Sequence, residues 1–110
     1  MTTITICKTV SGAYKGFTTI GHAEYAKRGK PDILCSAISA LVINAINTLE
    51  ELHHQDMTVV TNEETGFIKC DFNSSLQTES IVIIDSMVFG LENLMKTYGN
   101  KFLQVKFEEV

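Results

Sequence analysis

The first half of the chain alternates between strand-like and helix-like patterns of apolar residues. Apolar and polar residues alternate over Thr2–Val10, which predicts a strand rich in β-branched residues. Ser11-Gly12 supplies a turn, so Ala13–Gly21 is predicted to be a second strand, antiparallel to the first. From Ile33 to about His53 the apolar residues recur at helical spacing, which predicts a long helix.

The second half of the chain predicts two more strands, a second helix and a last strand. Two short strands, Met57–Thr61 and Phe67–Phe72, flank a hairpin loop that ends in glycine. Ser74 with Gln77 forms a possible capping box for a second helix, which Tyr98-Gly99 would end. A last strand is predicted over Lys101–Val110. The order ββαββαβ predicts an α+β fold, with two helices on a largely antiparallel or mixed sheet.

The first helix carries apolar residues around most of its middle. Ala40, Val42, Ile43 and Ile46 widen its apolar side until little polar surface remains. Such a helix is buried on most sides. One small sheet and one other helix can cover only part of it, so we expect a homodimer that buries the remainder.

Size and charge narrow the possible functions. The 110 residues, of which 45% are hydrophobic, predict a single domain over 1–110 with a real core. The net charge of −4 argues against nonspecific nucleic-acid binding. The one basic cluster, Lys27-Arg28-Lys30, is interpreted as part of a solvated loop.

The cysteines indicate a reducing compartment. The number of cysteines is odd (Cys7, Cys35 and Cys70), and no two of them form a CxxC pair. The first ten residues lack the charged start and the cleavage site of a signal peptide. No apolar run is expected to reach the roughly 18 residues needed to cross a bilayer. We therefore predict a cytoplasmic protein without a membrane segment. Because possible ligands are scattered, we predict no metal site and no cofactor.

Cys35 and His22 are candidates for nucleophilic catalysis. Asp32 is a predicted helix N-cap, which places Cys35 in the first helical turn, where free N–H groups and the helix dipole stabilise a thiolate. His22 would end the second strand with one imidazole nitrogen open to that helix end. The alternatives are a buried packing thiol and an ordinary exposed histidine. His53 and His54 lie near the far end of the helix, which leaves His22 as the base.

Three further residues could support this pair. Gly21 precedes the histidine, and Asp32 would fix the helix start. Ser39 lies one helical turn after Cys35, where it could orient His22 or contact substrate, or instead bond back to the Cys35 carbonyl. Cys7 and Cys70 fall within strands, where packing is their expected role.

Two motifs resemble the Prp family, the ribosomal-processing cysteine proteases of bacteria. Gly21-His22-Ala23 matches the strand motif of that family, and Asp32–Ser39 (DILCSAIS) matches its helix start, with Leu34 and Ser36 as conservative departures. The order of elements matches over essentially the whole chain. The Lys30-Pro31 pair makes the intervening loop one residue longer than the family pattern.

The resemblance implies an endopeptidase that removes a short N-terminal extension from a large-subunit ribosomal protein precursor. It implies Cys35 as nucleophile, His22 as base, Gly21, Asp32 and Ser39 as supporting residues, and substrates with a Phe-Phe pair followed by Ala. Backbone N–H groups of Cys35 and its neighbour are expected to hold the oxyanion, and the loop Ala23–Lys30 could close on the peptide. The main alternative is a non-catalytic ribosome-assembly factor, and a redox-sensing thiol protein is a second.

Overall fold

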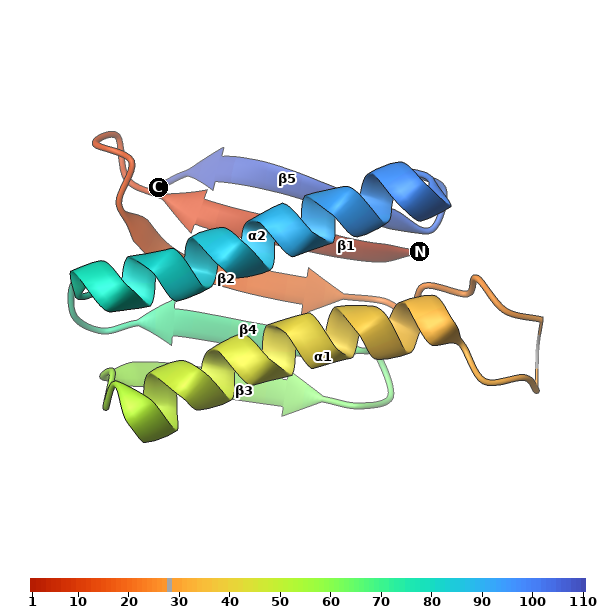
Figure 1. Cartoon of the computed structure of the whole chain (residues 1–110), viewed down its shortest axis with the longest axis horizontal. Helices are drawn as coiled ribbons and strands as arrows, with labels where there is room; N and C mark the ends of the chain where they lie inside the picture. Colours follow the sequence, from red (N-terminus) through yellow and green to blue (C-terminus); the bar gives the residue numbers. More distant parts are fainter. Residues whose placement is uncertain (28) are drawn as a thin grey trace.

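The computed structural model describes residues 1–27 and 29–110 and contains five strands and two long helices (Figure 1). The elements follow the chain as β1 (Thr2–Lys8), β2 (Tyr14–Ile20), α1 (Ile33–Asn47), a π-helical turn η1 (Thr48–Leu52), β3 (Met57–Asn62), β4 (Phe67–Phe72), α2 (Thr78–Tyr98) and β5 (Leu103–Glu109). The predicted ββαββαβ order and the α+β class are confirmed, and the strand ends differ from the predicted ones by only one or two residues.

The strands form one mixed sheet in the order β3-β4-β2-β1-β5. Three neighbouring pairs are antiparallel, whereas β1 and β5 run parallel, with Thr2 opposite Leu103. The chain therefore begins inside the sheet, and its last strand completes one edge. The β3–β4 hairpin forms the other edge, which lies beside α1 (Figure 1).

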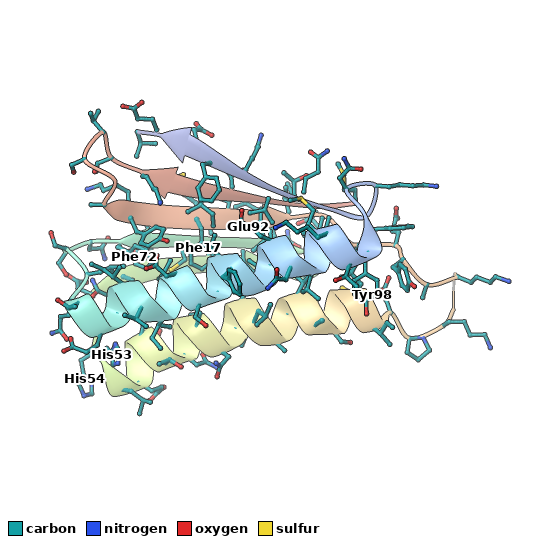
Figure 2. All side chains as sticks on the ribbon, turned by 45° about the horizontal axis from the view of Figure 1, so that its top comes forward. Phe17, His53, His54, Phe72, Glu92 and Tyr98 are labelled. Atoms are coloured by element: carbon teal, nitrogen blue, oxygen red, sulfur yellow. The ribbon has the colours of Figure 1, made fainter. Side chains whose placement is uncertain are left out.

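Both helices cover the same face of the sheet (Figures 1 and 2). Alternate strand residues point towards the helices, so Ile4 and Ile6 are fully buried, while the intervening threonines face the opposite side. Phe17 and Phe72 pack edge to face in this layer, with ring centroids 6.3 Å apart. The core thus lies between one sheet face and two helices, as an amphipathic two-layer arrangement requires.

The helix α1 and the turn η1 together form a long apolar segment. Over Ile33–Leu52 the mean hydropathy reaches 1.6, so by length and composition alone the segment could cross a membrane. The expectation that no run is long and apolar enough is therefore wrong. The core helix of a globular protein can be equally long and apolar. Six side chains of this segment are buried in the core: Leu34, Ile38, Val42, Ala45, Ile46 and Leu49.

The start of α2 also differs from the prediction. The helix begins at Thr78 with Gln77 as its N-cap, and the Gln77 side chain makes no capping hydrogen bond. Ser74 instead accepts hydrogen bonds from Gln55, whose amide Nε2 donates to both the Ser74 carbonyl and the Ser74 hydroxyl. The predicted capping box is therefore wrong because Ser74 binds the segment that precedes β3.

Candidate active site

His22 follows the end of β2, where a glycine lets the chain turn. Gly21 has a φ of +91°, and a Cβ at this position would collide with the Met1 carbonyl oxygen. A side chain is therefore disfavoured both by backbone conformation and by space. The Gly21 N–H donates to the Thr65 carbonyl at 2.9 Å, and His22 Nε2 lies 2.9 Å from the Glu64 carbonyl oxygen. Gly21 thus fixes the backbone from which His22 projects.

Cys35 is the third residue of α1, in the helix turn where the sequence placed it. The predicted N-cap is confirmed: Asp32 has an extended backbone, and its Oδ1 accepts a hydrogen bond from the Cys35 N–H at 3.0 Å. The Cys35 side chain is partly exposed, so an incoming molecule can reach it.

Asp32 also holds the loop before the helix. Its Oδ2 accepts hydrogen bonds from the Tyr25 N–H at 2.8 Å and from the Ala26 N–H at 3.2 Å. Partial burial raises the pKa of the Asp32 carboxyl, but the hydrogen bonds from the Cys35, Ala26, Tyr25 and Leu34 N–H groups outweigh burial and lower that pKa below its ordinary value. The carboxylate is therefore ionised and joins two segments.

These hydrogen bonds bear on the predicted oxyanion hole. The Cys35 N–H donates to the Asp32 side chain, and the Ser36 N–H donates to the Asp32 carbonyl at 3.0 Å. A hydrogen already engaged in a good bond is not free to bind a developing oxyanion. That Cys35 and its neighbour form the oxyanion hole therefore stays a prediction, and it requires these N–H groups to exchange partners when substrate binds.

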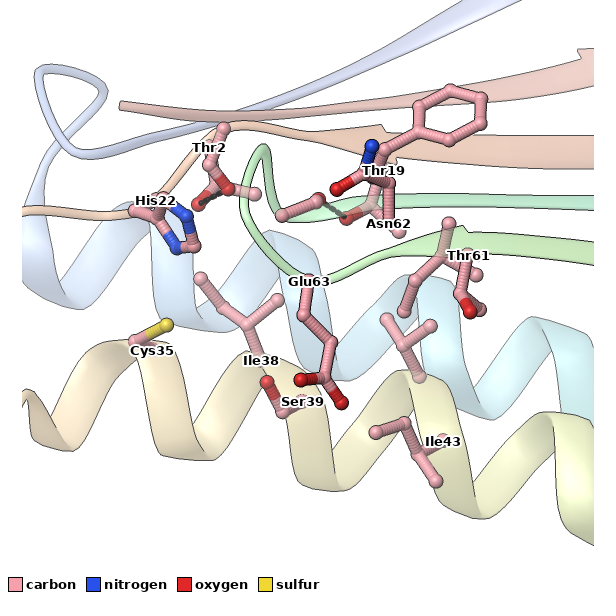
Figure 3. A pocket seen from close by; sticks show the side chains of 15 residues that line it. Thr2, Thr19, His22, Cys35, Ile38, Ser39, Ile43, Thr61, Asn62 and Glu63 are labelled. Atoms are coloured by element: carbon pink, nitrogen blue, oxygen red, sulfur yellow. Dashed lines mark hydrogen bonds between the residues drawn. The ribbon is translucent and has the colours of Figure 1, made fainter.

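Cys35 and His22 line the same cavity, which has a volume of about 320 Å³ (Figure 3). Figure 3 shows the Cys35 thiol on α1 pointing towards the His22 ring at the end of β2. Ser39 lies further along α1 and also lines the cavity. The helix side of the cavity is one row of residues at i, i+3, i+4, i+7 and i+8 spacing: Cys35, Ile38, Ser39, Val42 and Ile43.

The opposite wall comes from the β3–β4 hairpin, which the sequence analysis did not assign to the site. Thr61, Asn62 and Glu63 end β3 and begin the turn, and Phe67 and Ile68 begin β4. Figure 3 shows the Glu63 side chain extending towards α1 near Ser39. No motif marks these residues, because their proximity to Cys35 arises only when β4 pairs with β2.

The other two cysteines are less suited to act as nucleophiles. Burial, followed by the charges of Glu108 and Asp71, raises the pKa of Cys7. Burial, with Asp71 and Glu50, raises the pKa of Cys70 to about 12. Because the thiolate is the reactive form, a raised pKa makes both side chains weaker nucleophiles near neutral pH.

The two remaining histidines lie at the other end of α1 (Figure 2). His53 Nδ1 is 2.8 Å from the hydroxyl of the buried Ser80, so His53 links the end of the first helix to α2. His22 is therefore the histidine that the fold brings to Cys35.

The loop Ala23–Lys30 is anchored at its beginning. The Tyr25 ring packs edge to face on Tyr98 and Phe102, with centroids 4.9 Å and 5.2 Å away. Arg28, part of the basic cluster and of the predicted lid, lies outside the described residues. Closure of this loop on a peptide stays a prediction.

Comparison with solved structures shows the same fold in bacterial proteins. Prp from S. aureus in complex with a covalently linked product peptide superposes with a TM-score of 0.89 at 20% identity, covering 98% of this chain and 100% of that one. A Streptococcus mutans protein superposes with a TM-score of 0.84 at 23% identity, covering 100% of this chain and 96% of that one.

Sequence comparison gives the family. The chain is 28% identical over 86 residues to the ribosomal processing cysteine protease Prp of Bacillus subtilis (strain 168), covering 74% of this chain and 76% of that protein. The family model described as cysteine protease Prp matches residues 1–103. With nearly the whole chain matched, this protein belongs to the Prp family of cysteine proteases.

Proposed function

We propose that Cys35 is the nucleophile and His22 the general base of this cysteine protease. One observation carries the assignment: of the three cysteines and three histidines, Cys35 and His22 line one cavity. The raised pKa values of Cys7 and Cys70 support the same choice. Gly21 and Asp32 act as supporting residues, because they fix the backbone before His22 and the helix turn that carries Cys35. We assign Ser39 a contact with the substrate, because it lines the same cavity.

The reaction follows from these two side chains. His22 takes the proton from the Cys35 thiol, and the thiolate attacks the carbonyl carbon of the scissile peptide bond. Protonated His22 then gives this proton to the leaving amine as the peptide C–N bond breaks. Water, deprotonated by His22, attacks the resulting thioester, releases the acid product and regenerates the Cys35 thiol.

The substrate that we propose is a large-subunit ribosomal protein precursor, from which the enzyme removes a short N-terminal extension in the cytoplasm. The relative from Bacillus subtilis is named a ribosomal processing protease, which supports this choice. The cavity is suited to an extended apolar segment, because Ile38, Val42, Phe67 and Ile68 line it. Glu63 at its rim would favour a basic residue in the bound peptide.

We further propose that the protein is a homodimer. Large apolar side chains of the two helices stay exposed outside the cavity, including Ile33 (60%), Val82 (60%) and Phe89 (68%). A second copy would remove them from water by two-fold association. Sedimentation equilibrium at micromolar concentration tests this, and a single species near 12 kDa would contradict it.

The decisive experiment for the dyad uses matched cysteine variants. Purified protein is incubated with ribosomal protein precursors, and new N-termini are identified by mass spectrometry. Cys35→Ala should abolish cleavage, and His22→Ala should lower kcat/KM by several orders of magnitude. Cys7→Ala, which removes a thiol outside the cavity, should keep wild-type turnover. Cleavage by folded Cys35→Ala would overturn the assignment of Cys35 as nucleophile. Absence of cleavage by the folded wild-type protein would favour a non-catalytic assembly factor.

A further inference from the structure

The β3–β4 turn contacts the imidazole of His22. His22 Nε2 lies 2.9 Å from the backbone carbonyl oxygen of Glu64. A carbonyl oxygen only accepts hydrogen bonds, so Nε2 must carry the proton. In the neutral ring the other nitrogen, Nδ1, is then unprotonated and available as a base.

The position of this carbonyl is fixed by several other bonds. The Glu64 N–H donates to Asn62 Oδ1 at 3.1 Å, and the Gly66 N–H donates to the Glu63 carbonyl at 3.3 Å, which closes the turn. The Gly21 N–H donates to the Thr65 carbonyl at 2.9 Å. The turn is therefore bonded both within itself and to the residue that precedes His22.

Gly66 brings the turn close to the ring. Its φ is +63°, and a Cβ there would lie 3.2 Å from His22 Cε1 and 2.5 Å from the Gly21 carbonyl oxygen. A side chain at this position would push the turn away from His22. The close approach that the Glu64 hydrogen bond needs thus depends on glycine at position 66.

We infer that the β3–β4 turn, Asn62–Gly66, is a positioning element for catalysis: through the Glu64 carbonyl it holds His22 with Nε2 protonated, and Nδ1 is the nitrogen that exchanges the proton with Cys35. The inference rests on the proposed function, in which His22 is the base. Glu64 acts through its backbone, so the role is independent of its side chain.

This arrangement also stabilises the charged intermediate. When Nδ1 takes the Cys35 proton, the ring becomes an imidazolium, and the Nε2–H bond to the Glu64 carbonyl becomes charge-assisted and stronger. The proton later leaves from the same Nδ1 to the amine of the departing peptide. Nε2 keeps its proton throughout the cycle. The Glu64 carbonyl thus acts as the third group that orients the base of a nucleophile–base pair.

The first test measures the tautomer directly. Long-range ¹H–¹⁵N correlation spectra of ¹⁵N-histidine-labelled protein, recorded at a pH where the ring is neutral, identify the protonated nitrogen. The His22 signal is assigned by its loss in His22→Gln. We expect the Nε2–H form. A predominant Nδ1–H form would overturn the inference, and this result needs no variant that disturbs the turn.

The second test uses alanine variants at two glycines that both have a positive φ. Gly66→Ala should lower kcat/KM by about 100-fold, mostly through kcat, because displacement of a catalytic group by about 1 Å costs that much. Gly12→Ala is the control: Gly12 also has a positive φ, +89°, but nothing lies within 4 Å of its Cβ position. Gly12→Ala should keep wild-type kinetics. In Gly66→Ala the Nε2–H preference of His22 should weaken, and an unchanged tautomer with unchanged kcat would overturn the inference.

Failure of this inference is distinguishable from failure of the proposed dyad. If His22→Ala retains turnover, then His22 is not the base, and the proposed function fails. If His22→Ala is inactive while wild-type His22 carries its proton on Nδ1, the dyad stands and only the role of the turn is refuted.

Discussion

Replacement of Asp32 should destabilise the protein through two separate contacts. Asp32→Ala removes the N-cap of α1, which costs about 1 kcal/mol. It also removes the acceptor for the Tyr25 and Ala26 N–H groups. A hydrogen bond to a charged group contributes about 1.5–3 kcal/mol when it is buried. Asp32 is partly exposed, so water can replace its carboxylate as acceptor, and we take about 0.5 kcal/mol for each of the hydrogen bonds from Tyr25 and Ala26. The sum is about 2 kcal/mol.

Equilibrium urea unfolding measures this loss. The midpoint should fall with an unchanged m value, and the melting temperature should fall by about 8 °C, because 1 kcal/mol corresponds to about 4 °C for a domain of this size. Glu51→Ala, which removes an exposed carboxylate, is the control. Asp32→Asn should fall between wild type and Asp32→Ala, since one amide oxygen can still cap the helix.

The pH dependence gives a second check on Asp32. Its pKa is lowered in the folded protein, so the stability that it contributes is fully present above its ordinary pKa of 3.8. That contribution is lost as the pH falls through the folded-state pKa. The stability difference between wild type and Asp32→Asn should therefore shrink below about pH 4. An Asp32→Ala loss within 0.5 kcal/mol of the Glu51→Ala loss at neutral pH would refute the reasoning.

Two other predictions concern the core and the layer contacts. In native protein at pH 8, iodoacetamide should modify Cys35 and leave Cys70 unmodified, because burial raises the pKa of Cys70 to about 12; Cys70 should react once urea unfolds the chain, and peptide mass spectrometry distinguishes the sites. Tyr14→Phe should lower the free energy of unfolding by about 1 kcal/mol in the same urea assay, because the Tyr14 hydroxyl on β2 donates to Asp85 on α2; no measurable loss would show that this hydrogen bond contributes nothing net.

The elements of the fold were predictable because each has a clear local pattern. The alternation of Ile4 and Ile6 with threonines marks β1, and the helical spacing of apolar residues marks α1 and α2. The start of α2 was missed for a physical reason. Serine is a residue type that often caps helices. The Ser74 hydroxyl and carbonyl, however, accept hydrogen bonds from the Gln55 side chain, which comes from another part of the chain. Local propensity yields to such long-range bonds.

The site was predictable only in part, and the division follows the same logic. Cys35, His22 and Asp32 belong to sequence motifs, so their proximity could be expected. The hairpin wall and the Glu64 carbonyl could not be, because a backbone oxygen has no sequence signature and reaches His22 only through pairing of β4 with β2. Likewise, the capping of the Cys35 N–H by Asp32 decides which donors are free, and composition alone does not reveal it.

The parallel pairing of β1 with β5 has a consequence for biosynthesis. Thr2 lies opposite Leu103, so β1 gains its second neighbour only after about a hundred further residues have been synthesised. Such long sequence separations slow folding, because the loop must close before the contact is gained. β2, which leads into His22, pairs with β1 and so belongs to a sheet that is completed last. During synthesis, the sheet that positions His22 is therefore expected to become stable only once β5 is available to pair with β1.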